Sequence, residues 1–272
     1  MTSPLIAVPQ SSSALTRFIV APNPGPMTLD GTNSYLVGAP GSGQVVVVDP
    51  GPLDENHLRA LATAGKVALI LVTHRHADHT AGSERLRELT GAPVRAADPA
   101  HCHGGSPLTD GEVIEAAGVL INVLSTPGHT SDSVCFHLPA DNGDNAGAGS
   151  VLTGDTILGR GTTVLDFPDG TVGDYLASLD RLSALGPAKV LPAHGPALPA
   201  LTDIAAEYRK HRLARLDQVR AALQQLGRDA TAGEVAADVY ADVDPSVRGA
   251  AELSVAAQLQ YPRAEDPRNG GA

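Results

Sequence analysis

Tryptophan is absent from the 272-residue sequence, and cysteine and methionine occur only twice each. The two cysteines, Cys102 and Cys135, lie far apart and have no partners at the spacing of a zinc ribbon. Neither a disulfide framework nor a cysteine-rich metal site is therefore expected, and we predict two reduced thiols. A chain of this length buries a large enough core to fold without covalent cross-links.

Long apolar runs are also missing. No segment approaches the roughly 18 apolar residues of a membrane span, and the N-terminus lacks the basic region and apolar stretch of a secretory signal. We therefore expect a cytoplasmic, soluble protein with no membrane partner. No heptad run indicates a coiled coil, and the sequence predicts no oligomeric state.

Positive charge and aromatic side chains are scarce. The sequence has 19 Lys and Arg against 30 Asp and Glu, a formal net charge of −11, which repels polyanions at long range. Three Phe and five Tyr leave few rings for stacking on bases. The basic stretch at 209–220 is best explained as a charged, solvent-exposed helix face. Composition thus disfavours RNA as a partner without excluding it.

Short apolar runs predict the strands of an α/β fold. Several consist almost entirely of Val, Ile and Leu, which indicates a sheet covered by helices on one side and by a second sheet on the other. Amphipathic helices are predicted at 54–65 and 173–186. The Asp- and Asn-rich stretch at 140–150 lacks the glutamate of a calcium loop and is expected to be a hairpin loop. The predicted strands are 33–38, 44–49, 66–73, 119–126, 133–138, 150–155 and 188–193.

The composition changes after Pro199. Three helices and no strand are predicted at 200–227, 231–240 and 245–260, and Thr231 with Glu234 matches a capping box. We therefore predict three parts: a main domain at 1–199, a small helical domain at 200–263 and a disordered tail at 264–272.

The segment THRHADHTAG (73–82) places four potential metal ligands directly after a predicted buried strand. A strand end holds the backbone rigid while its side chains reach the edge of the sheet. His74 and His76 are two residues apart and are able to share one side of the turn. Asp78 and His79 lie on the next stretch and are able to address a second centre.

Three further candidates, His129, Asp155 and His194, also follow apolar runs beside Gly or Pro. Imidazole and carboxylate ligands without thiolate favour zinc and would also admit iron or manganese. The remaining histidines are expected to be incidental, because their surroundings show no matching ligand pairs. They are His57, His101, His103, His137 and His211.

The HxHxDH motif followed by these three residues resembles the metallo-β-lactamase-fold superfamily over about residues 20–199. The resemblance implies an αββα sandwich with a dinuclear metal site at one edge. Asp49 would support the histidine loop from outside the ligand set. As the resemblance implies them, the ligands are His74, His76 and His129 for one metal, Asp78, His79 and His194 for the second, and Asp155 as the bridge.

Within the superfamily, the segments 23–38, 153–164 and 191–196 and the C-terminal helices resemble the β-lactamase-like protein 2 group. That group joins the hydrolase domain to a small winged-helix-like domain, although no strands for a wing are evident here. The best-known animal member is described as a single-strand endoribonuclease. Fungal relatives act as thioesterases in polyketide synthesis.

The implied chemistry is hydrolysis by a hydroxide held between two zinc ions, since metal binding lowers the pKa of water to about 7. Asp78 and Asp155 would hold or receive a proton. We expect a small ester or thioester as substrate, with RNA phosphodiester cleavage as the alternative. A non-catalytic metal-binding or sensor protein is a third hypothesis, which the scarcity of cysteine disfavours. Predicted substrate contacts in the loops are Thr32, Asn33, Arg160, Thr162 and Thr163.

Overall fold

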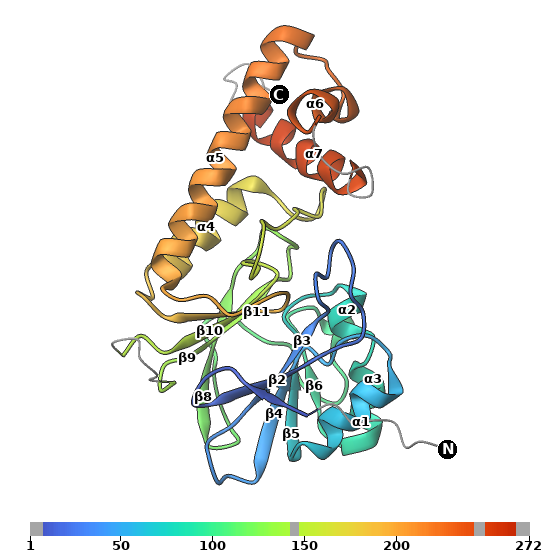
Figure 1. Cartoon of the computed structure of the whole chain (residues 1–272), viewed down its shortest axis with the longest axis vertical. Coiled ribbons are helices and arrows are strands. Elements are labelled where there is room, and N and C mark those ends of the chain that lie inside the picture. The colour runs from blue at the N-terminus through green and yellow to red at the C-terminus, as the bar shows by residue number, and fades with distance from the viewer. Residues whose placement is uncertain (1–7, 142–146, 242–247, 265–272) are drawn as a thin grey trace.

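The computed structural model of the chain describes residues 8–141, 147–241 and 248–264. Residues 142–146 of the hairpin loop predicted at 140–150 and nearly all of the predicted disordered tail lie outside these residues. The described part forms two sheets face to face, with helices on both outer faces and three helices at one end (Figure 1).

The first sheet contains six strands in the order β1-β2-β3-β4-β5-β6. Neighbours from β1 to β4 are antiparallel, whereas β4, β5 and β6 are parallel. The parallel strands end at the same edge of the sheet, and the segment 73–82, which carries four of the candidate ligands, begins at this edge. The strands are β1 (Gln10–Ser11), β2 (Thr16–Val20), β3 (Asn33–Val37), β4 (Gln44–Val48), β5 (Lys66–Leu71) and β6 (Val94–Arg95).

The second sheet contains five strands in the order β11-β10-β9-β8-β7. Only β10 and β11 are parallel neighbours, so their carboxyl ends also meet at one edge. The strands are β7 (Val113–Ala116), β8 (Val119–Ser125), β9 (Val134–Leu138), β10 (Ser150–Gly154) and β11 (Lys189–Pro192).

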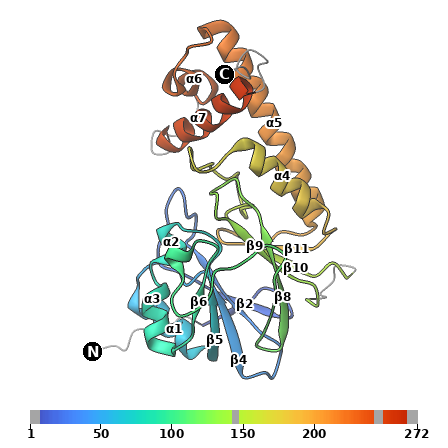
Figure 2. The ribbon, with the colours of Figure 1, turned by 180° about the vertical axis from the view of Figure 1, so that it is seen from behind.

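Helices cover the outer faces of both sheets (Figures 1 and 2). On the first sheet, α1 (Glu55–Thr63) and α3 (Ser83–Thr90) pack against the outward side chains. On the second sheet, α4 (Val172–Ser183) and α5 (Leu201–Leu226) do the same. The short helix α2 (Ala77–Thr80) and the 3₁₀ helix η1 (Pro99–His101) lie in connections.

The strand β4 explains why a continuous valine run predicts a doubly covered sheet. Val46 and Val48 point into the core between the sheets, while Val45 and Val47 point toward α1 and α3. Successive side chains of a strand alternate between its faces, so a strand buried on both sides is apolar at every position. The αββα architecture predicted from the sequence is thereby confirmed.

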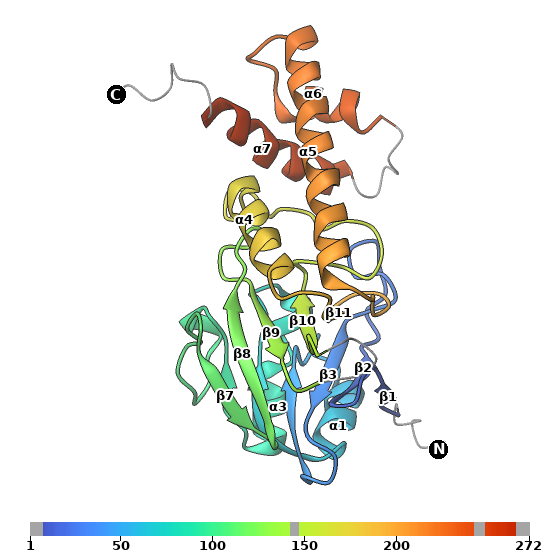
Figure 3. The same cartoon turned by 90° about the vertical axis from the view of Figure 1, so that its left-hand side faces the viewer.

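The C-terminal region consists of α5, α6 (Ala232–Val239) and α7 (Arg248–Ala264). The first half of α5 packs on α4, and its second half extends past the sheets to contact α6 and α7 (Figure 3). The predicted capping box at Thr231 and Glu234 is present at the start of α6. No strand occurs in the described residues after 200, so this part of the chain shows three helices and no wing.

Candidate metal centre

Asp49, at the end of β4, forms hydrogen bonds with the segment 73–82. Its backbone has a φ of 53°, a conformation that aspartate tolerates better than most side chains. One carboxylate oxygen accepts a hydrogen bond from the Thr73 backbone N–H, and the other accepts one from the Thr73 hydroxyl, both at 2.8 Å. The second oxygen also lies 2.9 Å from His79 Nδ1. Asp49 therefore joins the strand end, the start of the loop and one histidine in a buried network.

His74, His76 and His129 bring three imidazoles together. His76 Nδ1 lies 3.1 Å from His74 Nε2 and 3.0 Å from His129 Nε2. All three nitrogens lie within 4.8 Å of one another, so they are able to bind the same cation. His74 and His76 belong to the loop after β5, and His129 belongs to the loop between β8 and β9.

The other nitrogen of each imidazole in this cluster has its own partner. His74 Nδ1 lies 3.1 Å from the Thr73 hydroxyl, and His129 Nδ1 donates to the Val164 carbonyl at 2.6 Å. His76 Nε2 lies 3.1 Å from Asp166 Oδ2. Such partners fix the ring orientation and the tautomer of a metal ligand. The three rings are thus held with their free nitrogens pointing toward a common centre.

Asp78, His79 and His194 form a second cluster. Asp78 and His79 lie on α2, and His194 follows β11. The Nε2 atoms of the two histidines lie 3.3 and 3.2 Å from Asp78 Oδ2. The second ring nitrogen of His194 donates to the Gly31 carbonyl at 3.2 Å. This cluster therefore has the same plan as the first, with one nitrogen of each ring free and one engaged.

Asp155, which follows β10, lies between the two clusters. Its Oδ1 is 3.7 Å from His79 Nε2 and 3.4 Å from His194 Nε2. Its Oδ2 is 3.7 Å from His129 Nε2. The two oxygens of one carboxylate thus address different clusters, which is the arrangement of a bridging ligand.

The electrostatics of the clusters favour cation binding. Burial lowers the pKa of His74, and the nearby His79 and His129 lower it further, so this imidazole is neutral with a free lone pair. Burial disfavours ionisation of Asp78, but His79 and His194 outweigh it and hold the pKa of this carboxyl below its usual value. Burial lowers the pKa of His79 and His194, but the surrounding carboxylates outweigh it and raise both above the usual value, so a cation at the second cluster competes with protons for these imidazoles.

Three buried ligand atoms in the described residues have no hydrogen-bond partner: His79 Nε2, His194 Nε2 and Asp155 Oδ1. An unsatisfied buried polar atom costs roughly 1–3 kcal/mol. The two nitrogens lie around the Asp155 oxygen, so one divalent cation would satisfy all three atoms together. These residues therefore fit the pair of cations expected from the donor set.

Arg75 and two acids that the sequence pattern does not predict surround the first cluster. Asp166 accepts from Arg75 as well as from His76, and Asp169 accepts from Arg75 and from the Ser131 backbone. The acidic segment DFPDG (166–170) is the available signal, but it has no periodicity that would place it beside residue 76. Asp166 thus positions His76, and Arg75 positions Asp166.

Thr32 and Asn33, predicted to contact substrate, are buried and bonded to backbone groups. The Thr32 hydroxyl donates to the Asp78 carbonyl at 3.1 Å. The Asn33 amide donates to the carbonyls of Pro192 and Gly195, each at 2.9 Å. Neither side chain lines the cavity described below. In the structure they hold the segments that carry Asp78 and His194.

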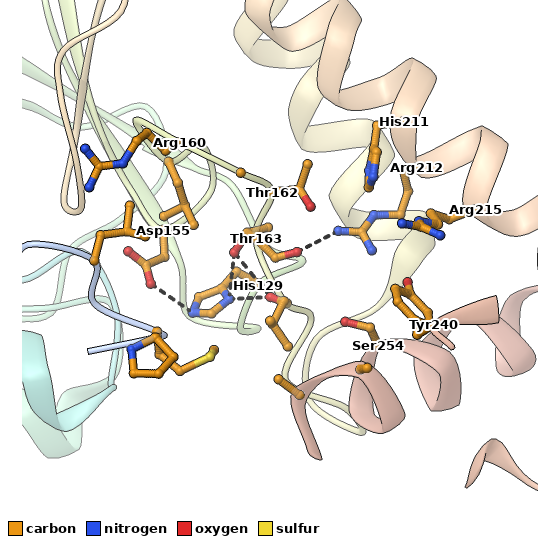
Figure 4. A pocket seen from close by; sticks show the side chains of 18 residues that line it. His129, Asp155, Arg160, Thr162, Thr163, His211, Arg212, Arg215, Tyr240 and Ser254 are labelled. Carbon is orange, nitrogen blue, oxygen red and sulfur yellow. Dashed lines mark hydrogen bonds and ion pairs between the residues drawn. The ribbon is translucent and has the colours of Figure 1, made fainter. Parts of the chain in front are cut away.

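A cavity of about 310 Å³ lies beside His129 and Asp155 (Figure 4). The predicted contacts Arg160, Thr162 and Thr163 line it, and Arg160 also pairs with the exposed Asp30 at 2.6 Å. The opposite wall comes from the C-terminal helices, as Figure 4 shows. The residues of that wall are His211, Arg212, Arg215, Tyr240, Ala250, Ala251 and Ser254.

Two of the predictions for α5 differ from the structure. The basic stretch 209–220 is predicted to be solvent-exposed, yet Arg212 is only 3% exposed and lines the cavity. His211, predicted to be incidental, lines the cavity as well. His57 agrees with its prediction, since its ring lies 2.9 Å from the Ser34 hydroxyl, away from both clusters. Both cysteines are free thiols, as predicted.

Residues 27–194 match the family model of the metallo-beta-lactamase superfamily. The chain belongs to the metallo-beta-lactamase superfamily. The match includes every residue of both clusters, and it confirms the predicted family and enzyme class, a metal-dependent hydrolase. No helix in the described part of the chain has the length and apolar character needed to cross a membrane.

Two curated relatives resemble most of the chain. A beta-lactamase-like protein 2 homolog from Caenorhabditis elegans is 30% identical over 253 residues, covering 88% of this chain and 81% of the relative. An atrochrysone carboxyl ACP thioesterase from Aspergillus chevalieri is 32% identical over 253 residues, covering 90% and 76%. The resemblance to the β-lactamase-like protein 2 group is therefore confirmed.

Two solved structures share the fold. A metallo-beta-lactamase family protein from Thermus thermophilus has a TM-score of 0.74 and 24% identity, covering 92% of this chain and 93% of its own. The protein TTHA1623, solved in a di-iron-bound form, has a TM-score of 0.55 and 29% identity, covering 71% and 98%. The first match extends over most of the chain, while the second is shorter.

Proposed function

We propose that this hydrolase uses two divalent cations, zinc in first place, to cleave a small ester or thioester. The observation that carries the proposal is the position of Asp155, whose carboxylate lies between two histidine clusters and also lines the cavity. Cations bound there would supply a water molecule activated for attack near neutral pH. Iron is an alternative, since the similar protein TTHA1623 was solved in a di-iron-bound form.

The residues of the chain would orient this water and manage its proton. Asp78 Oδ2 lies beside the Nε2 atoms of His79 and His194, and its side chain is 27% exposed and so reaches solvent. Its lowered pKa keeps the carboxylate ionised, so it accepts a hydrogen bond from the attacking water. Asp155 lines the cavity and would receive the proton.

The size of the cavity supports a small substrate. Pockets for small molecules usually measure about 300–1,000 Å³, and this cavity of about 310 Å³ is at the lower end. One of the similar proteins is named a thioesterase, which agrees with an acyl substrate. The net charge of −11 opposes the approach of a polyanion such as RNA.

A direct activity comparison tests this proposal. We expect the purified, zinc-supplemented chain to hydrolyse short-chain thioesters and to leave single-stranded RNA intact. His76→Ala should lower thioester kcat by at least about 100-fold, because it removes a ligand at the centre of the first cluster. His103→Ala removes a histidine outside both clusters and should leave kcat unchanged.

Two results would decide against the proposal. RNA cleavage that His76→Ala abolishes, without thioester turnover, would replace the acyl substrate by a phosphodiester. Thioester turnover that persists in His76→Ala would show that the histidine cluster does not carry the reaction.

A further inference from the structure

Positive charge is concentrated in the cavity beside the metal centre. Three arginines line it, whereas Asp155 is its only acidic lining residue in the part of the chain that the structure describes. Two of these arginines, Arg212 and Arg215, project from α5 on the wall opposite Asp155 (Figure 4). The third, Arg160, is paired with Asp30.

Arg212 is a buried cation without an acidic partner. It is 3% exposed, and one guanidinium nitrogen, Nη2, donates to the Thr163 carbonyl at 2.9 Å. Its Cζ lies 5.1 Å from the centre of the Tyr175 ring, and its Nε has no hydrogen-bond partner. No carboxylate in the described residues forms an ion pair with it. A buried charge is costly unless it is paired, so this side chain lacks a counter-ion.

The other arginines of α5 show that pairing is the usual arrangement on this helix. Arg209 pairs with Asp180 at 3.0 Å, and Arg220 pairs with Asp217 at 3.0 Å. Arg215, by contrast, donates to the neutral Gln218 at 2.9 Å and stacks 4.6 Å from the Tyr240 ring. Within the described residues, the two α5 arginines that line the cavity, Arg212 and Arg215, are therefore the arginines of this helix that have no acidic partner.

We propose that Arg212 and Arg215 form a subsite for an anionic group of the substrate, a carboxylate or a phosphate placed away from the bond that is cleaved. This inference rests on the proposed function, because the same cavity reaches Asp155 and His129. Guanidinium groups bind planar carboxylates and phosphates through two parallel hydrogen bonds. The substrate class is then an anionic small ester or thioester.

The apolar part of the cavity defines the rest of the substrate. Met27, Leu29, Leu158 and Val164 are among the lining residues. Short aliphatic chains suit such a surface, because burying apolar area is favourable. A thioester whose acyl or thiol part carries an anionic end on a short apolar linker would fit both regions.

Three thioesters of matched length test the subsite: one with uncharged ends, one with a carboxylate at the end of the acyl chain and one with a phosphate on the thiol part. We expect at least one anionic compound to have a kcat/KM about tenfold or more above the uncharged compound, since a charge-assisted hydrogen bond contributes that much. The preferred compound identifies whether the group is a carboxylate or a phosphate. Equal kcat/KM values for all three would overturn the inference.

Variants distinguish binding at this subsite from a general effect of the positive charge on α5. Arg215→Gln should reduce the preference for the anionic thioester about tenfold, and Arg215→Glu should reverse this preference. Arg209→Gln removes an exposed charge outside the cavity and should keep the preference. A preference that is unchanged in both Arg215 variants would contradict the assignment.

Arg212→Met tests the buried member of the pair. If the variant is folded by circular dichroism, the preference should be lost, and a retained preference would exclude Arg212 from the subsite. If it does not fold, the two Arg215 variants decide the matter. Failure of the proposed function has a different signature, because then the wild-type protein would hydrolyse none of the three thioesters.

Discussion

Asp49 Oδ2 is shared between the Thr73 hydroxyl and His79 Nδ1, and Asp166 Oδ2 is shared between Arg75 and His76. Each carboxylate thus connects an imidazole of one cluster to another segment of the chain. The two acids differ in how far the sequence predicts them. Asp49 directly follows a valine strand in a recognisable pattern, whereas Asp166 approaches His76 only after the chain has folded.

The variant Asp49→Asn tests whether Asp49 supports cation binding through His79 and Thr73. The amide keeps the size of the side chain but removes its negative charge, which faces His79. It also replaces one of the two carboxylate oxygens that accept hydrogen bonds from Thr73. We expect the affinity for the second cation to fall about 10–100-fold, the usual effect of losing such a supporting group. Competition with a chromogenic chelator measures this affinity.

Asp98→Asn is the matched control for this experiment. Asp98 caps the 3₁₀ helix η1 through the Ala100 N–H, outside both clusters, and its loss should leave metal affinity unchanged. A folded Asp49→Asn protein with wild-type affinity for both cations would contradict the role given to Asp49.

The elements that position the site differ in how clearly the sequence predicts them. The strands β3, β4, β5, β8, β9, β10 and β11 follow continuous or alternating apolar runs and are predicted within a few residues. The strands β1, β6 and β7 are not predicted, because they are short and lie at sheet edges, and β2 is not predicted, because it begins with the polar residues Thr16 and Arg17. Helix α5 is predicted, but the burial of Arg212 on it is not, because a helix segment rich in positive charge is usually exposed to solvent.

Tyr208 connects helix α5 to the loop that follows Asp155. Its hydroxyl accepts from the Leu158 N–H at 3.0 Å and lies 2.9 Å from the carbonyls of Leu158 and Gly161. Burial raises the pKa of Tyr208 to about 12, so the hydroxyl keeps its proton throughout the neutral range. The contact therefore fixes one wall of the cavity against the other.

Tyr208→Phe should lower the free energy of unfolding by about 1–3 kcal/mol, because it leaves the buried Leu158 N–H without its acceptor. Urea unfolding measures this change, and kcat/KM should fall as the loop loosens. Tyr261→Phe is the control, since no hydrogen bond of its hydroxyl occurs in the described structure and Tyr261 also packs beside α4. Equal stability of the two variants would show that Tyr208 does not hold the loop.

At the scale of the whole molecule, loops at the ends of strands from both sheets carry the candidate ligands, and the C-terminal helices complete the cavity. The loops that follow β5, β8, β10 and β11 bring distant residues together, and this convergence follows from strands that end at a common edge. The ligand set is therefore predictable from residue type and strand position. The position of Arg212 and Arg215 in the cavity wall is not predictable from the sequence, because it depends on how α5 packs against the second sheet. No local sequence pattern specifies that packing.

The metal content of the purified chain tests the central claim most directly. After zinc supplementation and removal of loose metal by desalting, elemental analysis should find two tightly bound divalent cations per chain, one for each cluster joined by Asp155. Asp155→Asn, which weakens the bridge, should retain fewer. A wild-type protein that holds less than one transition metal per chain under these conditions would contradict the account.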